Sequence, residues 1–164
     1  MTPVTMPYRL PALPWLPAPL RLLGRLAAGR LPGQVVIQYT DRCNASCVQC
    51  GMRRDNPAPR TTMDPGAARR LLDNLAARGV VAISFTGGEP LLHVNDVCAL
   101  AAHARATGIS HVRTGTNGFL FLGHERPGFA GRMRELADKL LAAGFSTFWI
   151  SLDSADPATH EANR

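Results

Sequence analysis

The segment from Val35 to Cys50 reads VVIQYTDRCNASCVQC, an apolar run that leads directly into three closely spaced cysteines. The run from Val35 to Tyr39 is short and rich in β-branched residues, as strands buried in a parallel sheet are. A polar loop that holds the three cysteines follows it. The segment therefore predicts a buried strand whose carboxyl end leads into a loop of thiols.

The same order of a short apolar strand, a polar loop and a helical pattern ending at glycine occurs four times from Val35 onward. The first predicted helix has Asp64 as its N-cap, Pro65 at its first position and Gly79 just past its end. The alternation predicts an α/β fold with a parallel sheet, helices outside it and chemistry at the carboxyl ends of the strands. The predicted strands are 35–39, 81–86, 111–116 and 147–152, and the later helices are 94–106, 129–143 and one that begins at 156.

The spacing of Cys43, Cys47 and Cys50 is typical of a metal centre. Three and two residues separate them, so they can hold one side of a compact metal centre, and no fourth cysteine lies close by in the sequence. One metal position would then stay open, as a catalytic centre needs. The spacing favours an iron-sulfur cluster.

Two other interpretations of the cysteines compete with the cluster. The four cysteines could form two disulfides, but three of them fall between residues 43 and 50 in a chain without a secretory signal, which favours free thiols. The alternative that stays open is a structural zinc site completed by a distant ligand, namely His93, Cys98 or His103. Of these, Cys98 lies in an apolar stretch of a predicted helix and is expected to be a packed thiol.

Polar residues also end the other three predicted strands. The loops read TGGEPLL from Thr86 to Leu92, TNG from Thr116 to Gly118 and SLDS from Ser151 to Ser154. In the first of these, the two glycines let the backbone approach a ligand, Glu89 offers a carboxylate to an ammonium group and Pro90 stiffens the exit. All four strands thus end in candidate site residues, as the predicted fold requires.

Taken in order, Cys-x3-Cys-x2-Cys, Gly-Gly-Glu-Pro, Thr-Asn-Gly and Ser-Leu-Asp resemble the radical SAM superfamily over about residues 35–164. The resemblance implies a partial parallel (β/α) barrel and a 4Fe-4S cluster whose unique iron chelates the methionine part of S-adenosyl-L-methionine. It further implies that one electron splits this cofactor into methionine and a 5′-deoxyadenosyl radical, which takes hydrogen from an unidentified substrate, a small molecule or a peptide. A reductant such as flavodoxin or ferredoxin would supply the electron.

The resemblance also implies roles for individual residues, with Cys43, Cys47 and Cys50 as the cluster ligands. Those implied for the cofactor are Gly87, Gly88, Glu89 and Pro90 at the methionine ammonium, Asn117 nearby, Ser151 and Asp153 toward the methionine or ribose, and Arg164 toward the carboxylate. Ser151 and Asp153 alternate along a predicted strand, so we expect them to point to the same side. Gln49 stands where family members often have an aromatic residue that packs on the adenine. Its amide either hydrogen-bonds the base or is simply exposed, and both interpretations stay open.

The number of strand-helix units departs from the family pattern. Radical SAM cores usually have six units, and the sequence predicts about four. An eight-unit barrel takes about 250 residues, so six units need about 190. We therefore expect residues 34–164 to be a core that is incomplete at its C-terminal end. A truncated fragment without catalytic activity is accordingly an alternative to an active enzyme.

Residues 1–33 read as a proline-rich leader with a candidate amphipathic helix over 20–31. This helix could make peripheral contact with a membrane surface or close the underside of the domain. The second interpretation is favoured because Arg30 falls within the apolar arc.

Composition and charge restrict the remaining function classes. Apolar residues make up 46% of the chain, but no run is long enough to span a membrane, and prolines interrupt any secretory signal. The net charge of +6 comes from basic residues spread along the chain, with Lys139 as the single lysine. Nucleic-acid binding usually needs a basic cluster, so it is disfavoured. We expect a cytoplasmic protein.

Overall fold

The computed structural model describes residues 17–27, 33–52 and 57–164. The chain forms two compact units, residues 1–32 and 33–164. In the first, helix α1 covers Ala18–Ala27, and its Leu20 and Leu23 are exposed. The rest of the predicted helix, including Arg30, lies outside the described residues, so its contact with a membrane or with the domain stays a prediction. Among the described residues, no helix is long and apolar enough to cross a membrane.

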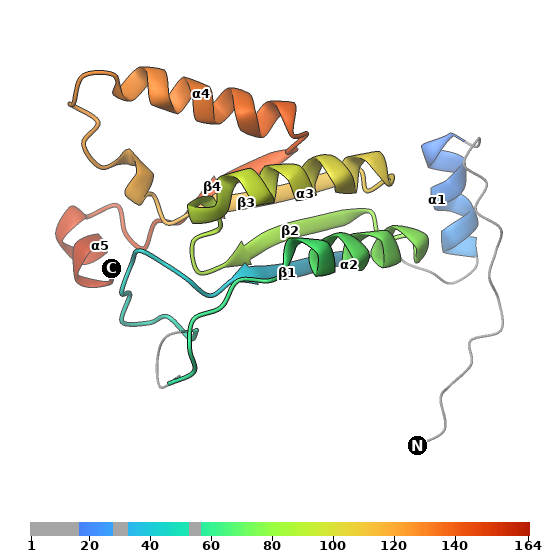
Figure 1. Ribbon diagram of the computed structural model, residues 1–164, viewed down its shortest axis with the longest axis horizontal. Helices are drawn as coiled ribbons and strands as arrows, with labels where there is room; N and C mark the ends of the chain where they lie inside the picture. The colour runs from blue at the N-terminus through green and yellow to red at the C-terminus, as the bar shows by residue number, and fades with distance from the viewer. Residues whose placement is uncertain (1–16, 28–32, 53–56) are drawn as a thin grey trace. The chain divides into compact units, whose positions relative to one another are not determined.

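Four parallel strands form the sheet of the second unit, in the order β1-β2-β3-β4 (Figure 1). The strands are β1 (Gln34–Thr40), β2 (Ala82–Gly87), β3 (His111–Thr116) and β4 (Thr147–Ile150). They alternate with helices along the chain, which confirms the predicted fold class as an incomplete, open version of the barrel. The prediction was wrong at the end of the fourth strand, which stops at Ile150.

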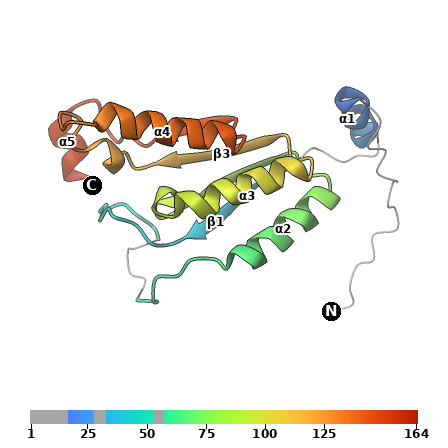
Figure 2. The same cartoon turned by 45° about the horizontal axis from the view of Figure 1, so that its top comes forward.

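The three long helices of this unit lie on one face of the sheet (Figure 2). They are α2 (Pro65–Ala77), α3 (Val94–Ala106) and α4 (Phe129–Ala142). A shorter helix, α5 (Pro157–Ala162), follows β4. Two short 3₁₀ turns, η1 (Pro90–His93) and η2 (Phe119–Phe121), follow β2 and β3. The predicted start of α2 is confirmed, because the Asp64 carboxylate accepts a hydrogen bond from the Ala67 N–H at 2.8 Å.

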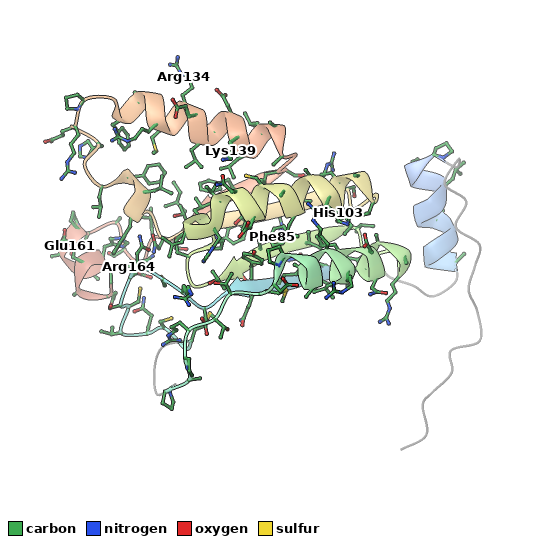
Figure 3. The ribbon with its side chains drawn as sticks, viewed as in Figure 1. Phe85, His103, Arg134, Lys139, Glu161 and Arg164 are labelled. Atoms are coloured by element: carbon green, nitrogen blue, oxygen red, sulfur yellow. The ribbon has the colours of Figure 1, made fainter. Side chains whose placement is uncertain are left out.

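The hydrophobic core fills the layer between the sheet and these helices. Phe85 of β2 is fully buried there (Figure 3), as are Leu72 of α2 and Leu100 of α3. Cys98 belongs to the same cluster, which confirms it as a packed thiol, and burial raises its pKa. Burying large apolar side chains against the strands fixes the sheet and therefore the positions of the loops at its carboxyl edge.

The other face of the sheet carries a different set of residues. Register and alternation place Val36, Ser84 and Arg113 in one row across β1, β2 and β3. Val36 is exposed, and Arg113 donates a hydrogen bond from Nε to Ser84 Oγ at 3.2 Å. Every residue of β4 is exposed as well, including Trp149.

Candidate functional site

The cysteines lie on a loop, residues 41–61, that we call the cysteine loop. Its two ends are paired, because Thr40 and Thr62 form an antiparallel bridge and their hydroxyl oxygens lie 2.8 Å apart. Two backbone hydrogen bonds extend this pairing, from Asp41 N to Thr61 O at 3.1 Å and from Met63 N to Tyr39 O at 2.8 Å. The loop is therefore anchored where β1 ends.

Cys43, Cys47 and Cys50 are free thiols, each partly exposed. The Cys50 N–H donates to the Cys47 carbonyl at 3.2 Å, and the N–H of the buried Ala45 lies 3.4 Å from Cys43 Sγ. Within the part of the chain that the structure describes, no three His, Cys, Asp or Glu side chains lie close enough to share one metal ion. The cysteines of a cluster each bind a different iron, so they need not share one ion. The loop presents three partly exposed thiols, the donor type that iron-sulfur clusters require.

Gly87 and Gly88 pack against the first residues of this loop. A Cβ atom on Gly87, whose φ is +125°, would lie 1.9 Å from the Thr40 carbonyl oxygen, and one on Gly88 would lie 2.1 Å from that of Arg42. The backbone N–H groups of Gly88 and Glu89 donate to the same two oxygens, at 2.6 and 2.8 Å. The close contacts of these two glycines are therefore with carbonyl oxygens of the chain itself. Their predicted contact with a ligand stays a prediction.

The Glu89 side chain joins β2 to β3. Only 3% of the residue is exposed, and its Oε2 accepts from Thr116 Oγ1 at 3.1 Å and from Asn117 N at 2.7 Å. Its Oε1 accepts from the Leu91 N–H at 3.1 Å, within the turn that Pro90 begins. A carboxylate has about four acceptor positions, so the contacts from described residues leave one on Oε1.

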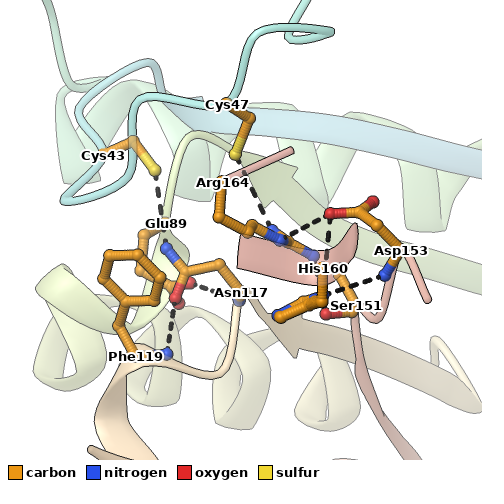
Figure 4. A network of polar contacts seen from close by, with 9 residues as sticks. All are labelled: Cys43, Cys47, Glu89, Asn117, Phe119, Ser151, Asp153, His160 and Arg164. Atoms are coloured by element: carbon orange, nitrogen blue, oxygen red, sulfur yellow. Dashed lines mark hydrogen bonds and ion pairs between the residues drawn. The ribbon is translucent and has the colours of Figure 1, made fainter. Parts of the chain in front are cut away.

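Asn117 follows β3 and reaches the cysteine loop (Figure 4). Its Nδ2 lies 3.6 Å from Cys43 Sγ and donates to Asn44 Oδ1 at 2.7 Å. Its Oδ1 accepts from the Phe119 N–H at 2.9 Å, which fixes the amide orientation. The predicted site residue on the third strand therefore does lie beside one of the predicted cluster ligands.

Arg164 reaches the same loop from the end of α5 (Figure 4). Its Nη1 lies 3.8 Å from Cys47 Sγ, and its Nη2 donates to the Ser151 carbonyl at 2.6 Å. Its Nε lies 2.7 Å from Asp153 Oδ2, close enough for an ion pair although the N–H is not aligned with that oxygen. The Arg164 side chain is 10% exposed, so Asp153 and Ser151 hold a largely buried guanidinium against the cysteine loop.

Ser151 and Asp153 lie beyond the end of β4. The expectation that they alternate along a strand was wrong, because the chain leaves the sheet at Ile150. Ser151 still donates its N–H to the Thr116 carbonyl at 2.9 Å, but Asp153 turns toward α5 and forms an ion pair with the Arg164 guanidinium. Ser151 and Asp153 therefore both contact Arg164 because the chain turns after β4, and not because they share a strand face.

Three further residues belong to this network and were not predicted. Asn44 and Thr116 hydrogen-bond the side chains of Asn117 and Glu89, and the His160 Nδ1 accepts from the Asp153 N–H at 3.2 Å. His160 had one usable signal, because it lies only four residues before Arg164 in the sequence. Thr116 lies in the Thr-Asn-Gly motif and Asn44 in the cysteine loop, but their partners come from distant segments, so their contacts had no local signal. Gln49 is exposed.

The distant residues considered as zinc ligands each have other partners. The His93 Nε2 lies 3.2 Å from Thr62 Oγ1, and its ring packs edge-on against Tyr39. The His103 Nε2 lies 2.7 Å from Asp73 Oδ1, between α3 and α2. Cys98 is in the core with its thiol toward the Lys139 carbonyl. The three candidates thus have separate environments in the fold.

Comparison with known proteins shows which family and fold the chain resembles. A family model described as the radical SAM superfamily matches residues 37–164. A PqqA peptide cyclase from Xanthomonas campestris pv. campestris is 35% identical over 128 residues, 77% of this chain and 30% of that protein. A GTP 3′,8-cyclase from Chlorobaculum tepidum is 37% identical over 129 residues, 78% of this chain and 35% of the cyclase. An Fe-coproporphyrin III synthase from Methanosarcina barkeri is 35% identical over 119 residues, 73% and 27% of the two chains.

A solved structure has the same fold. The crystal structure of BtrN in complex with AdoMet and 2-DOIA matches with a TM-score of 0.57 at 22% identity, and the match covers 77% of this chain and 48% of BtrN. The open conformation of BtrN gives a TM-score of 0.55 at 21% identity and covers 80% and 55% of the two chains. The chain spans about a third of the length of the curated relatives it matches.

Proposed function

The chain belongs to the radical SAM superfamily, and from this premise we propose that it binds a 4Fe-4S cluster through Cys43, Cys47 and Cys50 and cleaves S-adenosyl-L-methionine to begin radical chemistry. The observation that carries the proposal is the convergence at one edge of the sheet. The ends of β2, β3 and β4 and helix α5 all contribute residues that surround the cysteine loop. A parallel sheet brings these loops together because its strands all point the same way.

The residues present fit the group. Three thiols on one loop are free and partly exposed, and nitrogen donors from Asn117 and Arg164 lie near two of them. Thiolate ligands with N–H donors beside the sulfurs are the usual surroundings of iron-sulfur clusters. When bound, the cluster would supply the one electron that splits S-adenosyl-L-methionine into methionine and a 5′-deoxyadenosyl radical able to take hydrogen from a substrate.

For the cofactor, we assign the turn from Gly87 to Pro90 to the methionine ammonium. Glu89 supports this assignment, because its buried carboxylate is fixed by three N–H or O–H donors and keeps one acceptor position on Oε1. A charge-assisted hydrogen bond from an ammonium group would complete it. We also propose that Ser151 and Asp153 lie beside the methionine or ribose. Contact of Arg164 with the cofactor carboxylate stays part of the proposal. In the structure its Nη1 lies beside Cys47, and its Nε and Nη2 face Asp153 and Ser151.

The partners follow from the same chemistry. A one-electron donor such as flavodoxin or ferredoxin would reduce the cluster, and free thiols fit a reducing compartment, so we place the protein in the cytoplasm. The substrate is not assigned. The three relatives have nearly equal identity over 73–78% of this chain, yet their names refer to a peptide, to GTP and to a porphyrin. Their shared region therefore supports a common cofactor more than a common substrate.

Anaerobic reconstitution with iron and sulfide tests the proposal. We expect the wild-type protein to take up about four iron and four sulfide per chain, with a broad visible absorbance that bleaches on reduction. Cys43→Ala, Cys47→Ala and Cys50→Ala should each lose most of this iron. Cys98→Ala is the matched control and should retain it, because that thiol lies in the core.

Two results would contradict the proposal. One is equal iron uptake by wild type and by a variant with all three loop cysteines replaced. The other is a stoichiometric zinc content without iron in protein purified anaerobically, which would favour the structural zinc site.

A further inference from the structure

Side-chain nitrogens from two distant segments point at sulfurs of the cysteine loop. Asn117 Nδ2 lies 3.6 Å from Cys43 Sγ and Arg164 Nη1 lies 3.8 Å from Cys47 Sγ, across 74 and 117 residues of sequence. One donor follows β3 and the other follows α5, so neither contact results from local chain geometry. Figure 4 shows the two nitrogens approaching the loop from the ends of different elements.

Each donor is held in place by further contacts. The Asn117 amide is fixed at both ends, by Asn44 Oδ1 and by the Phe119 N–H. The Arg164 guanidinium is fixed by the Ser151 carbonyl and the Asp153 carboxylate, and its own carbonyl accepts from the Ser46 N–H at 3.3 Å. Partners of this kind orient a donor before the ligand binds and limit its freedom to turn away.

We propose that Asn117 and Arg164 are positioning residues that donate hydrogen bonds to the ligating sulfurs of Cys43 and Cys47 and thereby raise the reduction potential of the cluster. The inference rests on the proposed function, because it needs the cluster. Reduction adds negative charge to the cluster and its sulfurs, and an N–H donor beside a sulfur stabilises that charge. Hydrogen bonds to the sulfurs are one of the factors that set such potentials.

The sign of the Arg164 effect depends on Asp153. The carboxylate of Asp153 lies 2.7 Å from Arg164 Nε and offsets much of the guanidinium charge, so the N–H dipole supplies most of the present effect. Removing Arg164 should therefore lower the potential. Removing the charge of Asp153 should raise it, because the positive charge beside Cys47 is then no longer offset.

A redox titration of the reconstituted protein, followed by electron paramagnetic resonance without S-adenosyl-L-methionine, tests the inference. At a fixed applied potential we expect Arg164→Met and Asn117→Asp each to hold about tenfold less reduced cluster relative to oxidised cluster, since each loses one hydrogen bond to a charged group. In Asn117→Asp the negative charge added beside Cys43 acts in the same direction. For a one-electron couple this is a shift of about 59 mV to more negative potential. Asn117→Asp keeps the acceptor for the Phe119 N–H, so the turn is preserved.

Two variants serve as controls. Arg134→Met removes an exposed arginine from α4 (Figure 3) and should leave the potential unchanged. Asp153→Asn should shift the potential in the positive direction. A merely structural role for Arg164 and Asp153 would not give shifts of opposite sign.

Deuteron couplings of the reduced wild-type cluster in D₂O give a second readout. We expect couplings from exchangeable deuterons beside the sulfurs, with one coupling lost in each donor variant. If the Arg164→Met protein does not take up the cluster, the wild-type couplings and the shift in potential of Asp153→Asn still test the inference. Fully loaded variants with the wild-type potential, or wild-type protein without exchangeable couplings, would overturn this inference alone. A wild-type protein that takes up no cluster would overturn the proposed function and this inference with it.

Discussion

Gly87 and Gly88 show how a short motif acts at the scale of single residues. In the sequence they read as a turn that admits a ligand. In the structure the space beside each Cα is filled by the Thr40 and Arg42 carbonyl oxygens. The pair therefore fixes the distance between β2 and the start of the cysteine loop, and a larger residue would push the two apart.

Replacing Gly87 by alanine should destabilise the protein strongly. The new Cβ would meet the Thr40 carbonyl oxygen at 1.9 Å, and the φ of +125° is unfavourable for alanine. Backbone strain and overpacking together should lower the free energy of unfolding by about 3 kcal/mol, measured by urea denaturation.

Gly131→Ala is the matched control for Gly87→Ala. Gly131 lies in α4, where an added Cβ atom would meet no neighbouring group within 4 Å, so alanine should raise the free energy of unfolding by about 0.5–1 kcal/mol. A Gly87→Ala protein that unfolds at the same urea concentration as wild type would refute this packing.

At the scale of elements, one partly buried hydrogen bond joins strand β1 to helix α3. The Tyr39 hydroxyl donates to Asp96 Oδ2 at 3.2 Å, and the tyrosine is almost completely buried. Burial, followed by the Asp96 carboxylate, raises the pKa of Tyr39 from 10.0 to about 12. The contact thus depends on a protonated tyrosine.

This shift has a defined consequence for stability at alkaline pH. The unfolded tyrosine releases its proton near pH 10, below the folded pKa, so this contribution to stability is full below about pH 10 and is lost as pH rises to about 12. Tyr39→Phe should cost about 1 kcal/mol at neutral pH, through the lost hydrogen bond, and show a shallower alkaline decline. Urea denaturation of both proteins across this range measures the difference. Equal slopes for the two proteins would contradict the assignment.

The elements with local signals could be predicted from the sequence. Asp64 and Pro65 marked the start of α2, and the apolar runs marked β1 to β3, because caps and buried strands depend on neighbouring residues. The end of β4 was missed because Leu152 continues the apolar pattern, whereas the chain leaves the sheet at Ile150 and turns toward Arg164.

The sequence was enough to predict most residues of the candidate site but not the contacts between them. Parallel topology brings Cys43, Glu89 and Asn117 to one edge, and that follows from the order of strands. The contact between Arg164 and Cys47 spans 117 residues and depends on the path of the chain after β4, which no local pattern encodes. The same holds for the Asn117 amide beside Cys43.

At the scale of the whole molecule, the described sheet places four strand ends around one loop of thiols. Helices cover one face of this sheet, while Val36 and Trp149 on the other face are exposed. The matched relatives extend well beyond this region, since the match covers 27–35% of their length. The shared region therefore supports the proposed cluster and cofactor chemistry, whereas the names of these relatives refer to different substrates.

We propose that Cys43, Cys47 and Cys50 would leave one iron of the cluster free to bind S-adenosyl-L-methionine. The most direct test is the electron paramagnetic resonance spectrum of the reduced, reconstituted protein before and after this cofactor is added. We expect a cluster signal whose position and shape change with the cofactor, and no such signal from a variant without Cys43, Cys47 and Cys50. A cluster signal that is identical with saturating S-adenosyl-L-methionine, or a signal that survives in the triple variant, would contradict the claim.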